Sequence, residues 1–273
     1  MAHLAAPPRR AGRDHAAGRI GGTAVSRLRV RDVTVRFASL TALSNVRLEV
    51  DAGEVVSLVG PNGAGKTTLF NVITGFVQPV AGTVRLDGQR LNGRGSARIS
   101  RLGVARTFQV ARPFPELTVE DNVIVALGRA SYPHPLRTFG RARTPARRER
   151  AHGLLTEVGL PEPYDRPAGD LPVGHLRLLE VGRALATDPK VLLLDEPAAG
   201  LREPEVAQLE RVVARLRERG LAVVLVEHNV PLALRAADRV IVLAGGEVIA
   251  EGTPDEVRAD RTVIEAYLGT ANA

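Results

Sequence analysis

The stretch Gly60-Pro-Asn-Gly-Ala-Gly-Lys-Thr-Thr68 is the most informative part of this sequence. The stretch fits the pattern G-x-x-x-x-G-K-[ST], and an apolar run over 55–59 stops directly before it. The glycines let backbone N–H groups turn inward around a phosphate, and the N-terminus of a following helix adds its partial positive charge. We therefore predict a buried strand over 55–59, a phosphate-binding loop, and a helix from Gly65 to about Thr74.

Two side chains of this loop have a predicted chemical role. Lys66 reaches the β- and γ-phosphates of a nucleotide, and the Thr67 hydroxyl ligates Mg²⁺. The lysine is informative because the chain uses arginine almost everywhere and has only two lysines, Lys66 and Lys190. A flexible point charge is needed where a planar guanidinium would not do the same job. The predicted ATP-binding residues of the loop are Gly60, Pro61, Asn62, Gly63, Ala64, Gly65, Lys66, Thr67 and Thr68.

A second apolar run, 191–194, ends in two carboxylates, Asp195 and Glu196. In a parallel sheet the carboxyl ends of the strands form the edge where ligands bind. At that edge Asp195 can hold Mg²⁺ through water, and Glu196 can polarise the attacking water as a general base.

Composition and charge narrow the classes of function. The 273 residues suffice for one large domain or two small ones, and no stretch approaches the roughly 18 consecutive apolar residues that a membrane-spanning helix needs. There is no cysteine, which excludes disulfides and thiolate chemistry. The net charge is +7, but residues 1–31 and 128–150 each carry +6, so the remainder is net negative. With 3% aromatic residues, this distribution disfavours a nucleic-acid groove.

The rest of the chain alternates between strand and helix patterns around a helical middle part. We expect strands near 28–35 and 46–50 and, after the helical part, an alternation of strand, helix and strand that ends in a hairpin across Ala244-Gly245-Gly246. Thr118 is the expected N-cap of the first helix in the middle part. The expected helices are 118–127, 146–159, 175–186 and 204–219, and the later strands are 191–194, 221–226, 239–243 and 247–251.

Four further features follow in a characteristic order: Phe37, then Arg106-Thr-Phe-Gln109, Leu171-Pro-Val-Gly-His175 and Val226-Glu227-His228. Together with the two motifs above, they make the chain resemble the ABC ATPase family from Arg27 to Leu268. The resemblance implies a P-loop NTPase core of the α/β class, with an antiparallel β portion and an inserted helical subdomain. It also implies ATP and Mg²⁺ as ligands and ATP hydrolysis as the reaction.

The resemblance assigns roles to the individual residues. Phe37 would stack on adenine, and His228 would contact the γ-phosphate beside the base Glu196. Gln109 would meet both the attacking water and Mg²⁺, whose other ligands would be Thr67 and Asp195. The signature motif, which closes over ATP bound to a second ATPase subunit, would comprise Leu171, Pro172, Val173, Gly174 and His175.

The same resemblance divides the chain into parts. We expect a disordered basic tail over 1–24, a nucleotide-binding core over 25–112 and 186–254, and a C-terminal extension over 255–273. The helical subdomain with the signature motif would occupy 113–185.

Within the family, the chain is similar to the ATPases of branched-chain amino acid uptake. The similarity lies in five sequence segments, namely residues 105–109, 114–122, 184–189, 196–200 and 263–268. It implies two transmembrane permeases, a second ATPase subunit in a homodimer or heterodimer, and indirectly a periplasmic or lipid-anchored solute-binding protein. The place of action would be the cytoplasmic face of the cell membrane. Importers of urea or other amides, lipid or export systems, and soluble ABC proteins acting on ribosomes or DNA stay open as alternatives.

The signature motif departs from the family pattern L-S-G-G-Q. Pro172 replaces the serine, Val173 the first glycine and His175 the glutamine, while Gly174 remains. Arg202 falls where the family has an aspartate after the acidic pair. We expect a subunit that hydrolyses ATP on its own side and completes its partner's site less efficiently.

Overall fold

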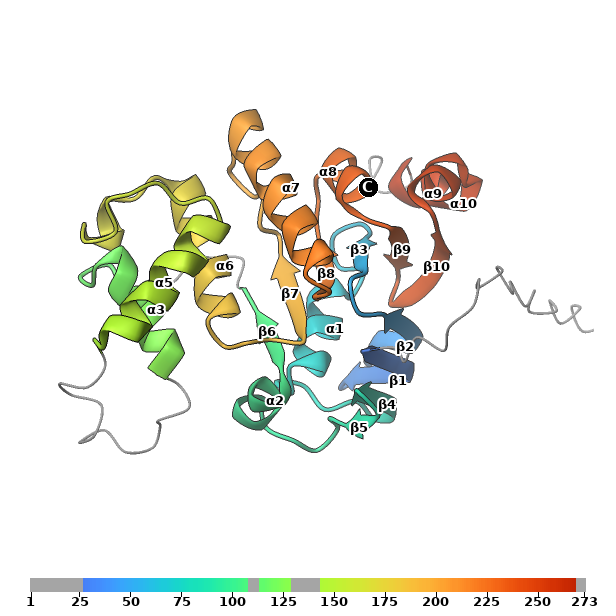
Figure 1. Cartoon of the computed structure of the whole chain (residues 1–273). Coiled ribbons are helices and arrows are strands. Elements are labelled where there is room, and N and C mark those ends of the chain that lie inside the picture. Colours follow the sequence, from blue (N-terminus) through green and yellow to red (C-terminus); the bar gives the residue numbers. More distant parts are fainter. Residues whose placement is uncertain (1–26, 108–112, 129–142, 269–273) are drawn as a thin grey trace, which may run out of the picture.

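The computed structural model describes residues 27–107, 113–128 and 143–268, which form two sheets and the helices around them (Figure 1). The smaller sheet is antiparallel in the order β2-β1-β4-β5. The larger has the order β10-β9-β3-β8-β7-β6 and is parallel except for β10 at its edge. The strands are β1 (Leu28–Phe37), β2 (Leu40–Val50), β3 (Val55–Val59), β4 (Ala81–Leu86), β5 (Gln89–Arg90), β6 (Val104–Arg106), β7 (Val191–Asp195), β8 (Ala222–Val226), β9 (Arg239–Ala244) and β10 (Glu247–Gly252).

The helices cover both faces of the larger sheet. They are α1 (Lys66–Ile73), α2 (Ser96–Leu102), α3 (Val119–Leu127), α5 (Pro145–Glu157), α6 (Val173–Leu185), α7 (Glu203–Glu218), α8 (Val230–Ala236), α9 (Pro254–Ala259) and α10 (Arg261–Leu268). Helices α3, α5 and α6 pack on one another beside β6 and β7 and are called the helical block below (Figure 1). None of the helices in the described part of the chain is both long and apolar enough to span a lipid bilayer.

The central strands are buried over their whole length because helices or the second sheet cover each face. All residues of β3, β7 and β8 are buried, as expected for apolar runs in a parallel sheet. Alternate side chains serve different cores: Leu192 and Leu194 pack with the helical block and α7, whereas Leu193 packs between the sheets around α1. A third, smaller cluster joins β9 and α8 to the C-terminal helices.

Most of the elements expected from sequence are confirmed, with their ends shifted by a few residues. Thr118 is the N-cap of α3, and its hydroxyl accepts a hydrogen bond from the Asp121 N–H. Helix α6 begins at Val173 instead of His175 because Pro172 serves as its N-cap. The apolar periodicity missed β4, β5, α2, β6 and α8–α10, all of which are short. The expected tail 1–24, part of the arginine-rich loop 128–150 and Gln109 lie outside the described residues.

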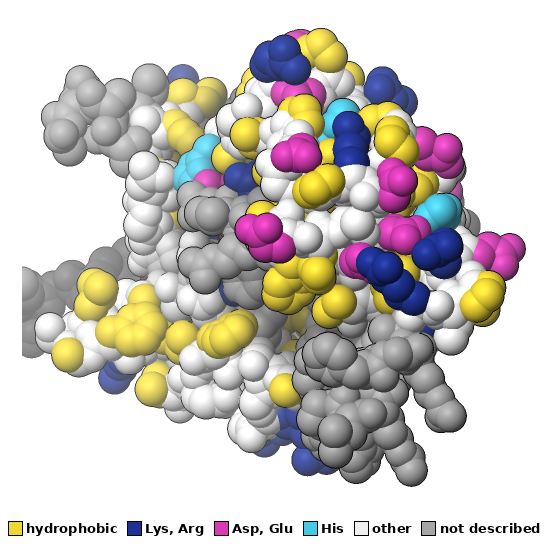
Figure 2. Space-filling view, turned by 90° about the vertical axis from the view of Figure 1, so that its left-hand side faces the viewer, with side chains coloured by type: hydrophobic (Ala, Val, Ile, Leu, Met, Phe, Trp, Pro, Cys, Tyr) yellow, Lys and Arg dark blue, Asp and Glu magenta, His cyan; other side chains and the backbone are white. Residues whose placement is uncertain are grey.

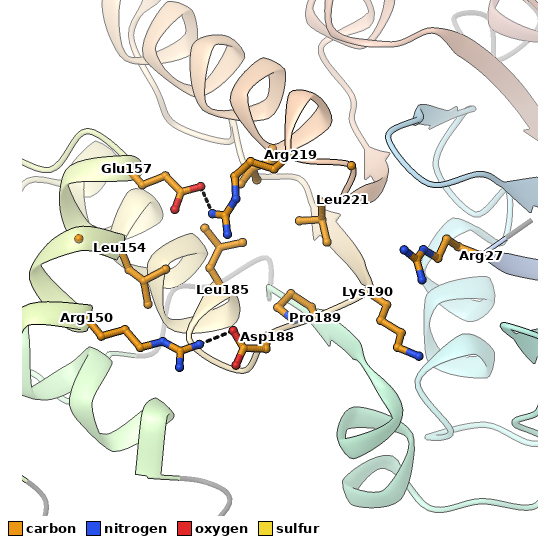
Figure 3. A pocket seen from close by; sticks show the side chains of 13 residues that line it. Arg27, Arg150, Leu154, Glu157, Leu185, Asp188, Pro189, Lys190, Arg219 and Leu221 are labelled. Atoms are coloured by element: carbon orange, nitrogen blue, oxygen red, sulfur yellow. Dashed lines mark hydrogen bonds and ion pairs between the residues drawn. The ribbon is translucent and has the colours of Figure 1, made fainter. Parts of the chain in front are cut away.

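Ion pairs join the helical block to the core around a cavity of about 610 Å³ (Figure 3). From α5, Arg150 pairs with Asp188 and Glu157 pairs with Arg219, on either side of Leu154 and Leu185. Farther along the cavity, Arg27 and Lys190 both pair with Asp87, at 3.4 and 2.6 Å. Each of these charges thus has a partner within the molecule, and we interpret the cavity as a structural seam.

Candidate functional site

The phosphate loop runs from the end of β3 to the start of α1 and is held by close backbone packing. Gly60, Gly63 and Gly65 have φ of +153°, +77° and +104°, which L-amino acids with a side chain rarely adopt. A Cβ on Gly60 would lie 2.0 Å from the Leu243 carbonyl oxygen, and one on Gly65 would lie 2.7 Å from that of Ala42. Glycine at 60 and 65 is therefore required by space as well as by conformation.

Lys66 folds back over this loop. Its Nζ donates hydrogen bonds to the carbonyl oxygens of Gly60 at 2.6 Å and Pro61 at 3.0 Å, which occupies two of its three hydrogens. Burial lowers the pKa of Lys66, and the nearby carboxylates of Glu196 and Asp195 counteract that effect. The lysine is thus held at the loop with a hydrogen left to donate to a phosphate.

A cavity of about 530 Å³ lies over the loop and collects most of the predicted nucleotide residues. Phe37, at the end of β1, forms one wall with its ring half exposed, as an adenine platform requires. The predicted lining residues that meet here are Phe37, Asn62, Gly63, Ala64, Gly65, Lys66, Thr67, Thr68, Glu196 and His228. Gly60 and Pro61 belong to the same loop but do not line the cavity.

The structure adds the β9–β10 turn to this cavity, which the sequence analysis treated only as a hairpin. Gly245 and Gly246 line the cavity, and the Gly246 N–H donates to the Ala64 carbonyl oxygen at 3.1 Å. A Cβ on Gly246 would lie 2.8 Å from the Ala42 carbonyl oxygen. The turn is therefore clamped between β2 and the phosphate loop, a contact that no local pattern encodes.

Glu196 and His228 meet at the carboxyl edge of the larger sheet. The register pairs Asp195 with Val226, so Glu196 lies close to the residues that follow β8, and His228 Nε2 is 2.8 Å from Glu196 Oε1. Glu196 has φ of +49°, a left-handed conformation that costs a non-glycine residue about 1–3 kcal/mol. Strain of this kind is typical of functional residues, which the surrounding structure must hold in place.

Glu227 provides part of that support, and the sequence analysis missed it. Its Oε1 accepts a hydrogen bond of 2.8 Å from the Ala198 N–H, in the turn that follows Glu196. The carboxyl group is almost fully buried, and this burial raises its pKa above the ordinary value. The sequence pattern singled out the adjacent His228. The role of Glu227 depends on its contact with Ala198, which follows the neighbouring strand β7 and is not visible in the sequence.

Asp195 is buried and does not line the cavity, whereas the next residue, Glu196, does. Its Oδ2 accepts a hydrogen bond of 2.6 Å from the Arg106 guanidinium, and its N–H donates to the Thr107 hydroxyl at 3.3 Å. Among the described residues, no group of three or more His, Cys, Asp or Glu side chains could hold a metal. One hydroxyl at Thr67 and one carboxylate at Asp195 fit Mg²⁺, which is usually bound through one or two protein ligands together with substrate phosphates.

The signature motif does not line the cavity of its own chain. Leu171 is buried, whereas Pro172 and Val173 at the start of α6 are exposed to solvent. Gly174 packs so closely on α7 that a Cβ would lie 2.5 Å from Glu205 Oε1. Arg202, the N-cap of α7, pairs with the same Glu205 at 3.3 Å and is otherwise exposed. The motif thus presents its first residues outward, away from the phosphate loop of its own chain.

The parallel sheet with a phosphate loop at its carboxyl edge defines a P-loop nucleoside triphosphatase. The family model described as "ABC transporter" matches residues 43–199, and that described as "Branched-chain amino acid ATP-binding cassette transporter" matches residues 247–273. The chain therefore belongs to the ABC transporter family, and it is an ATPase of that family.

Three known proteins illustrate the similarity. The "High-affinity branched-chain amino acid transport ATP-binding protein BraF" of Pseudomonas aeruginosa is 44% identical over 254 residues, covering 89% of this chain and 98% of that protein. The solved ADP conformation of an ATP-binding cassette of an ABC transporter is 33% identical, with a TM-score of 0.80 over 89% of this chain and 99% of that one. A dimeric cassette bound to ADP and Pi in a post-hydrolysis state is 28% identical, with a TM-score of 0.70 over 83% and 98%.

The close packing at Gly60 predicts a sharp difference between two glycine substitutions. Gly60→Ala should lower the free energy of unfolding by more than about 3 kcal/mol and abolish nucleotide binding, because the new methyl group meets a backbone oxygen. Gly88→Ala is the control: its φ is +78° but no atom lies within 4 Å, so only the conformational cost of about 1–2 kcal/mol is expected. Urea unfolding and titration with a fluorescent ATP analogue measure both, and equal losses would contradict the packing argument.

His175 predicts a pH dependence of stability. Burial lowers its pKa, Arg166 lowers it further and Glu205 opposes them, so the folded chain favours the neutral ring. Below about pH 6.5 the unfolded chain takes up the proton first, and stability therefore falls with falling pH, by less than about 1.4 kcal/mol per pH unit. His175→Gln should show a shallower fall between pH 7 and 5 in urea unfolding. Parallel curves for the two proteins would refute this assignment.

Proposed function

We propose that this chain is the ATPase subunit of an importer for branched-chain or related amino acids. The observation that carries the ATPase part is the single cavity in which the phosphate loop, Glu196 and His228 meet. The transport part is supported by the similarity to BraF along nearly the whole chain and by the branched-chain family match at residues 247–273.

The proposed reaction uses the groups described above together with Gln109, which lies outside the described residues. Lys66 and the backbone N–H groups of the loop would hold the phosphates, and the Phe37 ring would stack on adenine. Mg²⁺ would be held by Thr67, Asp195 and Gln109 and would neutralise charge on the transferred phosphoryl group. Glu196 would accept the proton of the attacking water, and His228, which is hydrogen-bonded to Glu196 through Nε2, would orient that carboxylate and contact the γ-phosphate.

We propose a second ATPase subunit as the partner that completes each site. The signature residues 171–175 do not line the cavity of their own chain, and Val173 is 57% exposed. One solved relative in the family is dimeric. In such a pair the N-terminus of α6 would face the nucleotide of the partner and contribute its helix dipole. Homodimer and heterodimer fit this arrangement equally.

Two transmembrane permeases would couple this ATPase to transport at the cytoplasmic face of the membrane, and a solute-binding protein would act indirectly. The face made by the helical block mixes hydrophobic, acidic and basic side chains in its described part (Figure 2). Phe114 and Val125 are exposed large apolar residues of this region, and we propose that the permeases contact this face. We propose that the chain divides into the expected core, helical subdomain and C-terminal extension, and that closure of the ATPase pair moves the helical subdomain.

Glu196→Gln tests the proposed base. The variant keeps size and hydrogen bonding but cannot accept a proton, so steady hydrolysis should fall at least about 100-fold while ATP affinity changes little. Lys66→Ala is the contrasting variant and should lose nucleotide affinity itself. Phosphate release and titration with labelled nucleotide separate the two effects. Full turnover in the glutamine variant would remove Glu196 from this role.

Tagged purification from native membranes in mild detergent, followed by mass spectrometry, tests the transport role. Two polytopic permeases and a second ATPase should be recovered with the chain. Recovery from the soluble fraction together with ribosomal or DNA-associated proteins would be consistent with the ATPase assignment but would overturn the importer assignment.

A further inference from the structure

Arg106 lies at the end of β6, where its guanidinium connects two separate elements of the nucleotide site. One nitrogen donates to Asp195 Oδ2 at 2.6 Å and the other to Asn71 Oδ1 at 2.7 Å. The flat face of the same group lies over the Phe70 ring, 5.5 Å from its centroid. Only 7% of the Arg106 side chain and 6% of the Asp195 side chain are exposed, so solvent barely screens this pair.

Asn71 connects this arginine to the phosphate loop. It follows Thr67 by four residues on α1, and residues four apart lie on the same face of a helix. The hydrogen bond from Arg106 to Asn71 therefore fixes the rotation of α1 about its axis, and with it the direction of the Thr67 hydroxyl. The second bond fixes the Asp195 carboxylate, whose other oxygen, Oδ1, has no hydrogen-bond partner among the described residues.

We propose that Arg106 is a positioning residue for the divalent metal: its two hydrogen bonds set the distance and orientation between Thr67 and Asp195 and thereby the affinity for Mg²⁺. The planar fork of arginine suits this task because it can donate in two fixed directions at once, which lysine cannot do. The inference rests on the proposed Mg²⁺–nucleotide site and adds a residue that touches neither nucleotide nor metal.

Two opposite effects of Arg106 must be weighed. Its positive charge by itself repels a cation, so its loss could strengthen metal binding. Its hydrogen bonds hold the ligands in place, and loss of such outer partners typically weakens metal affinity 10–100-fold. We expect orientation to prevail because the charge is already neutralised by the carboxylate it contacts, whereas nothing else described holds Asp195 Oδ2.

The decisive experiment measures Mn²⁺ binding to the full chain saturated with a non-hydrolysable ATP analogue, by electron paramagnetic resonance of free Mn²⁺. In Arg106→Met the Kd for Mn²⁺ should rise about tenfold or more, while affinity for the analogue in EDTA stays within about twofold. Asn71→Ala removes only one of the two hydrogen bonds of Arg106 and should raise the Kd for Mn²⁺ by a smaller factor. Arg106→Lys should restore part of the affinity.

Arg239→Met is the matched control. Arg239 also joins separate segments, because it donates to Glu54 Oε1 at 2.9 Å, to the Glu49 carbonyl oxygen at 2.6 Å and to Glu251 Oε1, but it does so at the amino ends of the strands. Its loss should lower the urea midpoint without changing the Kd for Mn²⁺. If Arg106→Met does not fold, Asn71→Ala provides the same comparison.

The experiment distinguishes failure of the positioning role of Arg106 from failure of the proposed metal site. An unchanged or tighter Kd for Mn²⁺ in folded Arg106→Met, or an equal rise in Arg239→Met, would refute the positioning role. Absence of analogue-dependent Mn²⁺ binding in the wild-type chain would instead refute the proposed metal site itself.

Discussion

The approach of β9 to the phosphate loop is the constraint on which the rest of the structure depends. Gly60 leaves β3 with no room for a Cβ beside the Leu243 carbonyl oxygen, and Gly65 is equally confined by Ala42 in the other sheet. The loop is thus shaped by two sheets at once. This packing fixes the path of the loop between β3 and the N-terminus of α1, where backbone N–H groups and the helix dipole favour an anion.

The exposed and the buried charged residues of this molecule have different roles. Exposed pairs such as Arg150–Asp188 tie the helical block to the core, and each contributes at most about 1 kcal/mol. Lys66, which lines the nucleotide cavity, and Asp195 and Glu227, which are sequence neighbours of the lining residues Glu196 and His228, are instead buried, and low solvent access strengthens electrostatic effects there. Burial of this kind costs stability, and hydrogen bonds from backbone and arginine offset that cost.

The nucleotide cavity of one chain does not include the signature motif of that chain. The cavity gathers groups for phosphate, adenine and water, but the N-terminus of α6 lies elsewhere and presents Pro172 and Val173 outward. Glu205 occupies the space beside Gly174 and also pairs with Arg202. The unusual residues at 175 and 202 therefore both lie near Glu205.

The sequence by itself determined the phosphate loop, the acidic pair and the central strands, because local spacing and apolar runs encode them directly. It also predicted from the acidic pair that Glu196 acts with the loop, whereas the roles of Phe37 and His228 were predicted only through resemblance to a family. The tertiary structure alone decided the parts that depend on strand order and register. The Gly245-Gly246 turn over Ala64, Glu227 beside Ala198, and Arg106 between Asn71 and Asp195 join segments far apart in the chain. No local pattern contains such contacts, since they arise only when the sheet brings those segments together.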